Sequence, residues 1–565
     1  MNVFGTSGRA TDFFQKKSYR PGQKEAIERI EKAFESDIRF VILEAPTGLG
    51  KSHIAAPFAF QSDDAFILTI QKILQDQYHS DFEKMFVMKG RSSYPCLAHP
   101  PDSCNFGLCK KKKETDENGR KIPISHPNCP YLLARSAAGK SKITLHNFDS
   151  FYYQNLFGVD FRDRKLLVVD ECHDIEKKFL DFMSFTVSNR RDPFLEIPRF
   201  DSLEKYDDLI ERYLGECQKI QGSLEEKKDY QELSNDEVRE LDRLLRLIIK
   251  IDKYFKTRKL EPPIEYIFDY KDHSDFQTVT LKPLFVGNFV KEHLFPKGKY
   301  TLMMSATILS KSIFCKSIGL DPEKTEFIQV PSYFPPENRP ILKRYVGSMT
   351  QRFIGETLKK IPPAIEGILK EHSRKKGIIQ THTKRIAGYI KTHSKNFRFT
   401  FNKDYPDPQK MLEKHKTKNQ SVIVASGLRE GLDLRGKLSE IQIFCKVPYP
   451  DLGDKRVQRK AQLDPRWYGY STALMFVQSL GRSVRSETEI AITYLLDSNF
   501  DSFLRRNEKF IPGYIKKALI NSHNDQRSLQ YKIRETVRSM EHAQLDEKNK
   551  IVKGGSKCSA PDAKS

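Results

Sequence analysis

One short stretch of the chain combines the residue types that bind nucleotide phosphates. Residues 41–52 read VILEAPTGLGKS: an apolar run, a glycine-rich turn, and then Lys51 and Ser52. Glycines let successive backbone N–H groups curl around phosphate oxygens, and a helix starting here directs its N-terminus at the anion. The lysine reaches the β- and γ-phosphates and the serine ligates Mg²⁺. We therefore predict an ATP–Mg²⁺ site at Ala45, Pro46, Thr47, Gly48, Leu49, Gly50, Lys51 and Ser52.

The alternative is a glycine turn with a chance Lys-Ser pair, since Ala45 stands where the usual pattern has its first glycine. An acidic pair further along the chain favours the nucleotide site. Residues 166–170 (LLVVD) read as a buried strand ending at Asp170, with Glu171 directly after it. Asp170 is expected to hold Mg²⁺, and Glu171 to polarise the attacking water. Upstream, Gln23 precedes an amphipathic helix at 24–34 and is a candidate contact to the adenine base, a simple helix entry being the alternative.

Four of the nine cysteines fall within residues 91–131, at Cys96, Cys104, Cys109 and Cys129. Their Cys-x7-Cys-x4-Cys-x19-Cys spacing matches neither a zinc ribbon nor a ferredoxin pattern. Four thiolates can enclose a zinc ion or an iron–sulfur cluster, and both readings stay open from the residues alone. His99 and His126 could substitute as ligands. The four-lysine run at 110–113 could grip phosphates, although such a run in a loop is usually only solvated.

Polar residues stand at the C-terminal ends of several expected strands. Parallel sheets bind their ligands at these ends. Thr69 lies near the end of the run at 65–70 and Gln71 follows it, while His146 and Asn147 follow the run at 141–145. These four are expected on the nucleic-acid side. Near the C-terminal end, QSLGRSVR places Arg482 and Arg485 three apart on one helical face, which suits arginine fingers facing a γ-phosphate. Surface salt bridging is the alternative for this pair.

Length and charge limit the class of protein. A chain of 565 residues is too long for one core, so two to four domains are expected. The formal net charge of +22 favours a polyanionic partner such as nucleic acid. No apolar run approaches a membrane span and the N-terminus has no secretory h-region. We expect an intracellular protein, in cytoplasm or nucleus, with no membrane partner.

The elements that position these residues fall into two α/β halves. Strand-like runs recur to residue 180, at 300–307 and from about 346 to 497. Between the first two groups, residues 181–297 lack sheet-like strands and read as a helical insertion with the apolar seam LDRLLRLIIKI. The polar tail at 545–565 is expected to be disordered.

The order of these motifs resembles the superfamily 2 DNA helicases, and within them the iron–sulfur, DinG/XPD-like branch. The motifs that carry the resemblance are Gln23, APTGLGKS, ILTIQKILQDQY, the cysteine quartet, VVDECH, MSAT, GLREGLDLRG and QSLGRSVR. The resemblance implies two tandem RecA-like P-loop domains. The first comprises 1–90, 133–180 and 298–340, interrupted by an iron–sulfur insertion at 91–132 and an Arch-like helical insertion at 181–297. The second comprises 341–544.

The resemblance also implies roles for residues. The four cysteines would hold a 4Fe–4S cluster, with zinc as the alternative. His173 and the Ser305-Ala306-Thr307 segment would link hydrolysis to the nucleic-acid side. Gly431 and Asp433 would couple the second domain to the nucleotide, and Gln478, Arg482 and Arg485 would complete the site, Arg485 being the first choice of finger.

The function implied is an ATP-dependent helicase that moves 5′-to-3′ on single-stranded DNA and opens forked DNA, duplex or DNA–RNA hybrid, in repair, replication or recombination. It is expected to act as a monomer; its protein partners and pathway are unknown from the sequence. Two alternatives are a single-strand translocase that remodels nucleoprotein complexes without unwinding, and a nucleic-acid-binding scaffold or sensor with a vestigial ATPase.

Overall fold

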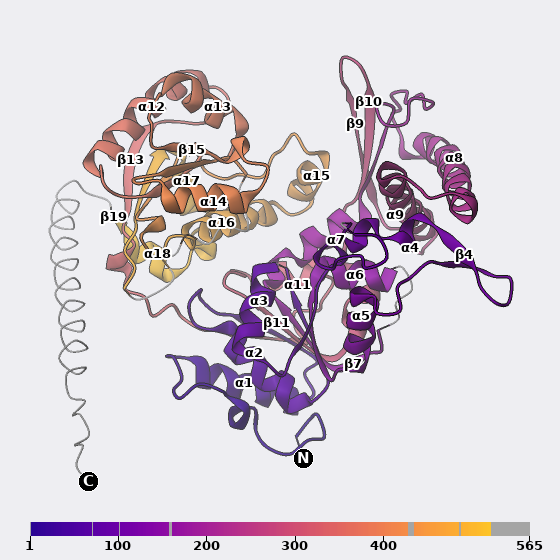
Figure 1. Ribbon diagram of the computed structural model, residues 1–565. Coiled ribbons are helices and arrows are strands. Elements are labelled where there is room, and N and C mark those ends of the chain that lie inside the picture. Colours follow the sequence, from indigo (N-terminus) through magenta and orange to yellow (C-terminus); the bar gives the residue numbers. More distant parts are fainter. Residues whose placement is uncertain are drawn as a thin grey trace, which may run out of the picture. The chain divides into compact units, whose positions relative to one another are not determined.

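The computed structural model describes residues 2–70, 72–100, 102–156, 161–427, 434, 436–484 and 488–520. The chain divides into two compact units (Figure 1). Unit 1 comprises Met1–Pro331 and Pro450–Tyr468, and unit 2 comprises Ser332–Tyr449 and Gly469–Ser565. The tail at 545–565, expected to be disordered, lies outside the described residues.

Unit 1 is built on a seven-stranded sheet in which every neighbouring pair is parallel. In sheet order the strands are β12 (Thr325–Gln329), β1 (Phe40–Glu44), β11 (Gly298–Ser305), β7 (Arg164–Asp170), β2 (Ala65–Thr69), β6 (Ile143–Asn147) and β3 (Phe86–Met88). The central strands are buried on both faces, as their continuous apolar runs require.

The register of this sheet brings the polar strand ends together. Glu44 pairs with Ser305, and Met304 pairs with Asp170, so β1, β11 and β7 end at one edge. Thr69 pairs with Asn147 at the same edge of β2 and β6. Parallel strands present their carboxyl ends together, and ligands of such sheets bind there.

Helices cover both faces of this sheet, as its two-sided burial demands. They are α1 (Gln23–Glu35), α2 (Lys51–Ser62), α3 (Lys72–Asp81), α5 (Pro130–Lys140), α6 (Phe148–Leu156), α7 (Ile175–Met183), α10 (Gly287–His293) and α11 (Lys311–Ser317). In α1 the buried residues Ala26, Ile27, Ile30 and Phe34 recur at the helical period, which explains why this stretch forms an amphipathic helix.

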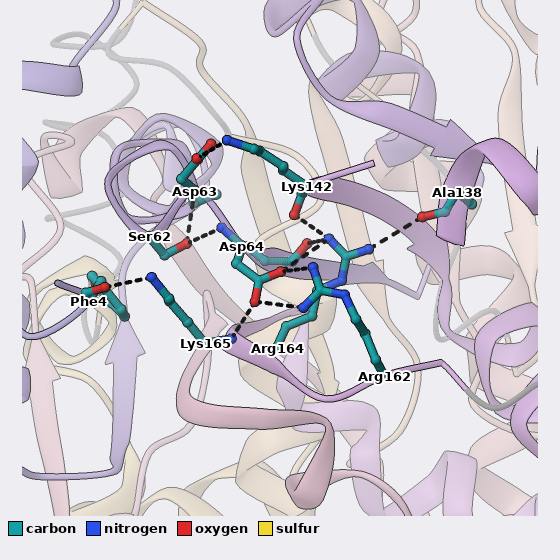
Figure 2. Close-up of polar contacts among 11 residues, drawn as sticks. Phe4, Ser62, Asp63, Asp64, Ala138, Lys142, Arg162, Arg164 and Lys165 are labelled. Atoms are coloured by element: carbon teal, nitrogen blue, oxygen red, sulfur yellow. Dashed lines mark hydrogen bonds and ion pairs between the residues drawn. The ribbon is translucent and has the colours of Figure 1, made fainter. Parts of the chain in front are cut away.

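A polar cluster fixes the starts of the strands, opposite the edge just described (Figure 2). The Arg164 side chain, 1% exposed, donates to the carbonyl oxygens of Ala138, at 3.3 Å, and Lys142. Arg162 binds both carboxylate oxygens of Asp64, at 3.1 and 2.7 Å. These bonds join the segments that precede β2, β6 and β7, and so help to hold their register.

The cysteine-rich segment forms a small lobe with its own core. Its elements are η2 (Arg91–Ser93), η3 (Cys104–Phe106), α4 (Leu108–Lys111), and the antiparallel pair β4 (Lys113–Thr115) and β5 (Lys121–Pro123), followed by α5. The core consists of Met88, Cys104, Tyr131 and Ala138.

The second insertion is not purely helical. Its two long helices are α8 (Leu203–Tyr230) and α9 (Asn235–Arg258), but an antiparallel sheet of order β8–β10–β9 accompanies them. The strands are β8 (Phe185–Ser188), β9 (Tyr266–Asp272) and β10 (Gln277–Pro283), and Figure 1 shows β9 and β10 as a long hairpin. The expectation that 181–297 lacks strands is therefore wrong. Only one face of this hairpin packs on the core, so its strands carry polar and charged residues on the other face. These residues interrupt the apolar run by which a buried strand is predicted.

Unit 2 carries a second seven-stranded sheet, again with only parallel pairs. Its order is β15 (Phe399–Phe401), β16 (Val422–Ala425), β14 (Gly377–Gln380), β17 (Ile441–Phe444), β18 (Ile492–Asp497), β13 (Ile341–Gly347) and β19 (Leu519–Ile520). The helices are α12 (Ile354–Glu371), α13 (Lys384–His393), α14 (Pro408–Thr417), α16 (Pro465–Leu480), α17 (Asn499–Arg506) and α18 (Gly513–Ala518). The predicted fold class, two tandem α/β domains, is confirmed.

One segment belongs to a different unit from its sequence neighbours. Helix α15 (Lys455–Leu463) and the first turn of α16 lie between β17 and β18 in the sequence, yet they pack with unit 1. We predicted that this segment belongs to the second domain, within 341–544. Among the described residues no helix combines the length and apolar character that a membrane span requires.

Candidate functional site

The phosphate-loop candidates connect the end of β1 to the start of α2. In chain order they are Ala45, Pro46, Thr47, Gly48, Leu49, Gly50, Lys51 and Ser52, with α2 beginning at Lys51. Gly48 and Gly50 have φ values of 87° and 83°, in the left-handed region that glycine enters without strain. The N-terminus of α2 thus faces the turn, which is the arrangement that binds anions.

Gln23 is tied to the backbone of this loop. Its Nε2 donates to the carbonyl oxygens of Leu49, at 2.6 Å, and Gly50, at 3.4 Å, while its Oε1 accepts from the backbone N–H of Arg20, at 2.7 Å. The Arg20 guanidinium donates to the carbonyl oxygen of Gly48. Gln23 and Arg20 therefore shape the loop from the start of α1. Arg20 and Gln23 form an Arg-x-x-Gln pattern, which is a weak sequence signal for contact with the adenine base.

The acidic pair lies at the end of β7, close to the loop. Lys51 Nζ is 3.9 Å from Glu171 Oε1. Burial raises the pKa of Asp170 to about 6, the neighbouring Glu171 adds to the shift, and Lys51 opposes it. Tyr78, which the sequence analysis missed, donates its hydroxyl to Asp170 Oδ2 at 3.4 Å. A cation beside two carboxylates is a site that can receive Mg²⁺ and a phosphate.

His173 joins the end of β7 to the end of β11. Its Nδ1 is 2.7 Å from Ser305 Oγ, and it contacts the carboxylates of Glu171 and Asp174, each at 3.4 Å. Burial alone would lower the pKa of His173, but hydrogen bonds to Asp174 and Glu171 outweigh it and raise the pKa to about 10. Thr307 donates its backbone N–H to Ser305 Oγ at 3.1 Å. These residues form one hydrogen-bonded chain that starts at Glu171.

The strand-end residues expected to meet nucleic acid occupy a different environment. Asn147 Nδ2 donates to the carbonyl oxygens of Thr69, at 3.4 Å, and Ile70, at 3.2 Å, so it joins two strands. Thr69 and His146 are fully buried. Gln71 lies outside the described residues.

His146 is a core residue, and its expected place on the nucleic-acid side is corrected. Its ring packs edge-to-face against Phe66, Phe151 and Phe161. Burial lowers the pKa of His146 to about 3. A neutral ring with no exposed surface cannot reach a phosphate from this position.

In unit 2, two of the predicted residues are described. Gln478 lies in the last turn of α16 and lines a hollow of about 40 Å³ with Gln380, His382 and Lys446. Its buried Nε2 has no hydrogen-bond partner among the described residues. Arg482 follows α16 and is buried.

Three further predicted residues, Gly431, Asp433 and Arg485, lie outside the described residues.

The four cysteines gather in the small lobe. Cys104 begins η3, Cys109 lies in α4, Cys129 caps α5, and Cys96 pairs by its backbone N–H with the loop before η3. Burial raises the pKa of Cys104 to about 11; Arg91 opposes the shift, and the thiols of the other three cysteines add to it. All four thiols are therefore close enough to interact electrostatically. Among the residues that the structure describes, no three His, Cys, Asp or Glu side chains form the ligand set of a metal ion.

Most of the lysine run beside the cysteines is paired with acids of the helical insertion. Lys110 contacts Asp242 of α9 at 2.5 Å, and Lys113 lies 3.2 Å from both Glu225 and Asp229 of α8. Lys111 is buried and contacts Asp102 and Glu232 at 2.8 and 3.6 Å.

These pairings change the interpretation of the run. Three of its four lysines pair with carboxylates, and two of them, Lys110 and Lys113, join the cysteine lobe to α9 and α8, so their charge is largely neutralised before any phosphate arrives.

Two family models match parts of the sequence. The one described as the helicase C-terminal domain matches residues 379–518, and the one described as the res subunit of the type III restriction enzyme matches residues 16–192. No curated protein matches the chain.

Solved structures of similar fold cover most of the chain. One described as an XPD helicase has a TM-score of 0.63 at 14% identity, covering 88% of this chain and 98% of its own. The Xpd4 protein of S. tokodaii has a TM-score of 0.54 at 14% identity, with 88% and 99% covered. An XPD structure in the apo form has a TM-score of 0.55 at 14% identity, with 87% and 98% covered.

The two matched domains and the nucleotide-binding geometry define an ATP-dependent enzyme with two tandem RecA-like domains. The chain carries the domains of an ATP-dependent helicase, and its fold is that of the solved XPD structures.

Proposed function

We propose that this helicase acts on DNA. It moves 5′-to-3′ along a single strand and opens duplex or DNA–RNA hybrid ahead of it, in repair, replication or recombination. The net charge of +22 supports a nucleic-acid partner. The choice of DNA and the polarity rest on the resemblance of the motifs to the DinG/XPD-like branch.

One observation carries the proposal: the chain of contacts that starts at the phosphate loop. Lys51 approaches Glu171, Glu171 contacts His173, and His173 contacts Ser305. In the proposed reaction Lys51 and Ser52 bind phosphate and Mg²⁺, with Asp170 as a metal ligand. Glu171 orients the attacking water, and loss of the γ-phosphate is relayed through His173 to the segment at Ser305 and Thr307.

Residues of unit 2 are proposed to complete the reaction. Gln478, Arg482 and Arg485 would approach the γ-phosphate, with Arg485 as the finger, and Gly431 and Asp433 would couple unit 2 to the nucleotide. The unpartnered amide of Gln478 supports a ligand-facing role, because a buried donor is costly unless something binds it. ATP would then be the ligand that both units share, and its hydrolysis would release them from each other.

The cysteine lobe is proposed to hold a 4Fe–4S cluster, with zinc as the alternative. Cys96, Cys104, Cys109 and Cys129 would be the ligands, and the cluster would serve to fold and stiffen the lobe. The chemistry of the donors supports this proposal, since four thiols share one small region and the Arg91 guanidinium opposes the rise that burial causes in the pKa of Cys104 and Cys109.

The test is strand displacement by anaerobically purified protein on duplexes with a 5′ or a 3′ single-stranded tail. ATP-dependent opening of only the 5′-tailed substrate is expected, with Lys51→Ala inactive on both. Opening of only the 3′-tailed substrate would overturn the polarity. Failure to open either, with strand-stimulated ATP hydrolysis intact, would indicate a translocase that remodels complexes without unwinding.

A further inference from the structure

A carboxylate that is 20% exposed, Glu176, lies in the first turn of α7, five residues after Glu171. Glu176 Oε1 accepts from Arg456 Nη2 at 2.7 Å and from Lys460 Nζ at 2.5 Å. Both cations come from α15, and their side chains are 7% and 4% exposed. Burial alone would raise the pKa of Glu176, but Lys460 and Arg456 outweigh it and lower the pKa to about 2. Glu176 therefore stays ionised between its two partners; burial lowers the pKa of Lys460, and the Glu176 carboxylate opposes that shift.

Other contacts seat α15 on the same part of unit 1. Arg456 Nε donates to the carbonyl oxygen of Pro283 at 2.9 Å. Asp454, which caps α15, accepts from Lys282 Nζ at 2.6 Å. Helix α15 is thus joined to α7 and to the end of β10 through groups that are largely removed from water, where such bonds are strong.

The turn from α15 into α16 is short and is held by side-chain contacts. A single residue, Asp464, separates the two helices, and its side chain accepts the backbone N–H of Arg466 at 3.0 Å. Lys460 lies 4.2 Å from the ring centroid of Trp467, in the first turn of α16. Helices α15 and α16 are therefore joined without a long linker.

Along the chain, the contact between Glu176 and α15 links the segments that carry the two groups of candidate catalytic residues. On one side, Glu176 follows Asp170 and Glu171 by a single 3-10 turn, η4 (Cys172–Asp174). On the other side, α16 carries Gln478 in its last turn, and Arg482 follows its end. Helix α16 begins in unit 1 and continues in unit 2, so it is a covalent rod joining the anchored segment to the second domain.

We propose that Glu176 is a positioning residue that couples ATP hydrolysis to movement, by holding α15 so that changes at Asp170 and Glu171 pass through α16 to Gln478 and Arg482. The inference rests on the proposed roles of those four residues. A network of three charges suits this task, because apolar side chains of similar size could stabilise the contact equally well without fixing its register.

The experiment measures ATP molecules hydrolysed per base pair opened on a tailed duplex, for the full-length protein and Glu176→Gln. The variant keeps the size of the side chain and removes its charge. ATP consumed per base pair is expected to rise about fivefold or more, in the range of ordinary coupling between sites. Arg459→Gln is the matched control on the same helix; Arg459 is 44% exposed and pairs only at the surface with Glu265, so its ratio should match that of the wild type.

A second variant separates coupling from a structural role. Lys460→Met removes one partner of Glu176, and the double variant with Glu176→Gln is expected to be no worse than the more affected single variant, because both act through one contact. If Glu176→Gln and Lys460→Met lower the melting temperature but leave ATP per base pair unchanged, the network is only structural and the inference is wrong.

If the proposed helicase function is wrong, the result differs from the one expected when only the role of Glu176 is wrong. In that case the wild type itself would open neither duplex. The same ratio is then measured as ATP hydrolysed per streptavidin displaced from biotinylated single-stranded DNA, and an unchanged ratio in both variants would again overturn the role of Glu176.

Discussion

Nδ1 of His173 lies 2.7 Å from Oγ of Ser305. His173 follows β7, and Ser305 is the last residue of the neighbouring strand β11. The contact therefore joins two strand ends at the edge where the phosphate loop begins. The backbone N–H of Ala45 donates to the carbonyl oxygen of Ser305 at 2.9 Å, which fixes the loop to the same point. A change in charge at Glu171 can thus reach the segment at Ser305 through His173 alone.

The pKa of His173 predicts a pH-dependent stability. It is raised to about 10 in the folded protein from an ordinary value of 6.5, so the stabilisation is complete below pH 6.5 and is lost as pH rises through about 10. The free energy of unfolding should therefore differ between wild type and His173→Gln at pH 6, and converge toward pH 10. Denaturant unfolding at pH 6, 8 and 10 checks this. A difference that does not change with pH would show that the imidazole is not held in its charged form.

Lys51→Ala should abolish ATP turnover while single-strand binding remains. Removal of one preorganised donor to the transferred phosphate costs about 100-fold or more in rate. Steady-state ATP hydrolysis and fluorescence anisotropy with a labelled oligonucleotide measure the two properties. Lys24→Ala is the matched control, since that lysine is 56% exposed and pairs only with Glu28. Normal turnover by Lys51→Ala would refute the phosphate-loop assignment.

Cys104→Ser should lower the iron content and the unwinding rate more than it lowers the rate of ATP hydrolysis. The reason is that the acidic pair and the phosphate loop belong to other elements of unit 1. Iron and sulfide per chain, strand displacement and ATP turnover are the measurements. Cys315→Ser provides the comparison, as Cys315 is buried in α11, outside the cysteine lobe. If Cys104→Ser keeps its metal and unwinds normally, the quartet is not a ligand set.

Lys113→Glu should loosen the cysteine lobe from α8 rather than weaken DNA binding. Two partly buried ion pairs, to Glu225 and Asp229, become repulsions, and the expected loss of stability is roughly 1 kcal/mol or more. Limited trypsin cleavage at Arg120 should accelerate.

Lys112→Glu is the control for Lys113→Glu, because Lys112 has no ion pair among the described side chains. Oligonucleotide affinity separates the interpretations: a larger loss for Lys113→Glu than for Lys112→Glu would mean that the paired lysine does contact phosphate.

Local patterns predicted much of the catalytic edge. The glycine turn before Lys51 and the acids after an apolar run depend on backbone chemistry within a few residues, so the sequence could indicate them without knowledge of the fold. The parallel sheet pairs Asp170 with Met304, the residue before Ser305, a juxtaposition that no local pattern predicted. Charge patterning was less reliable, because most of the lysine run at 110–113 found partners more than a hundred residues away.

The sequence by itself determined the class of enzyme and supplied the candidate residues of the phosphate loop, since both follow from short-range motifs in a fixed order. Tertiary structure decided the rest. It buried His146 among three phenylalanines, added the β9–β10 hairpin to the insertion, and seated α15 on unit 1 through Glu176. The physical reason is that burial and ion pairing depend on which distant segments meet, and no local periodicity records that choice.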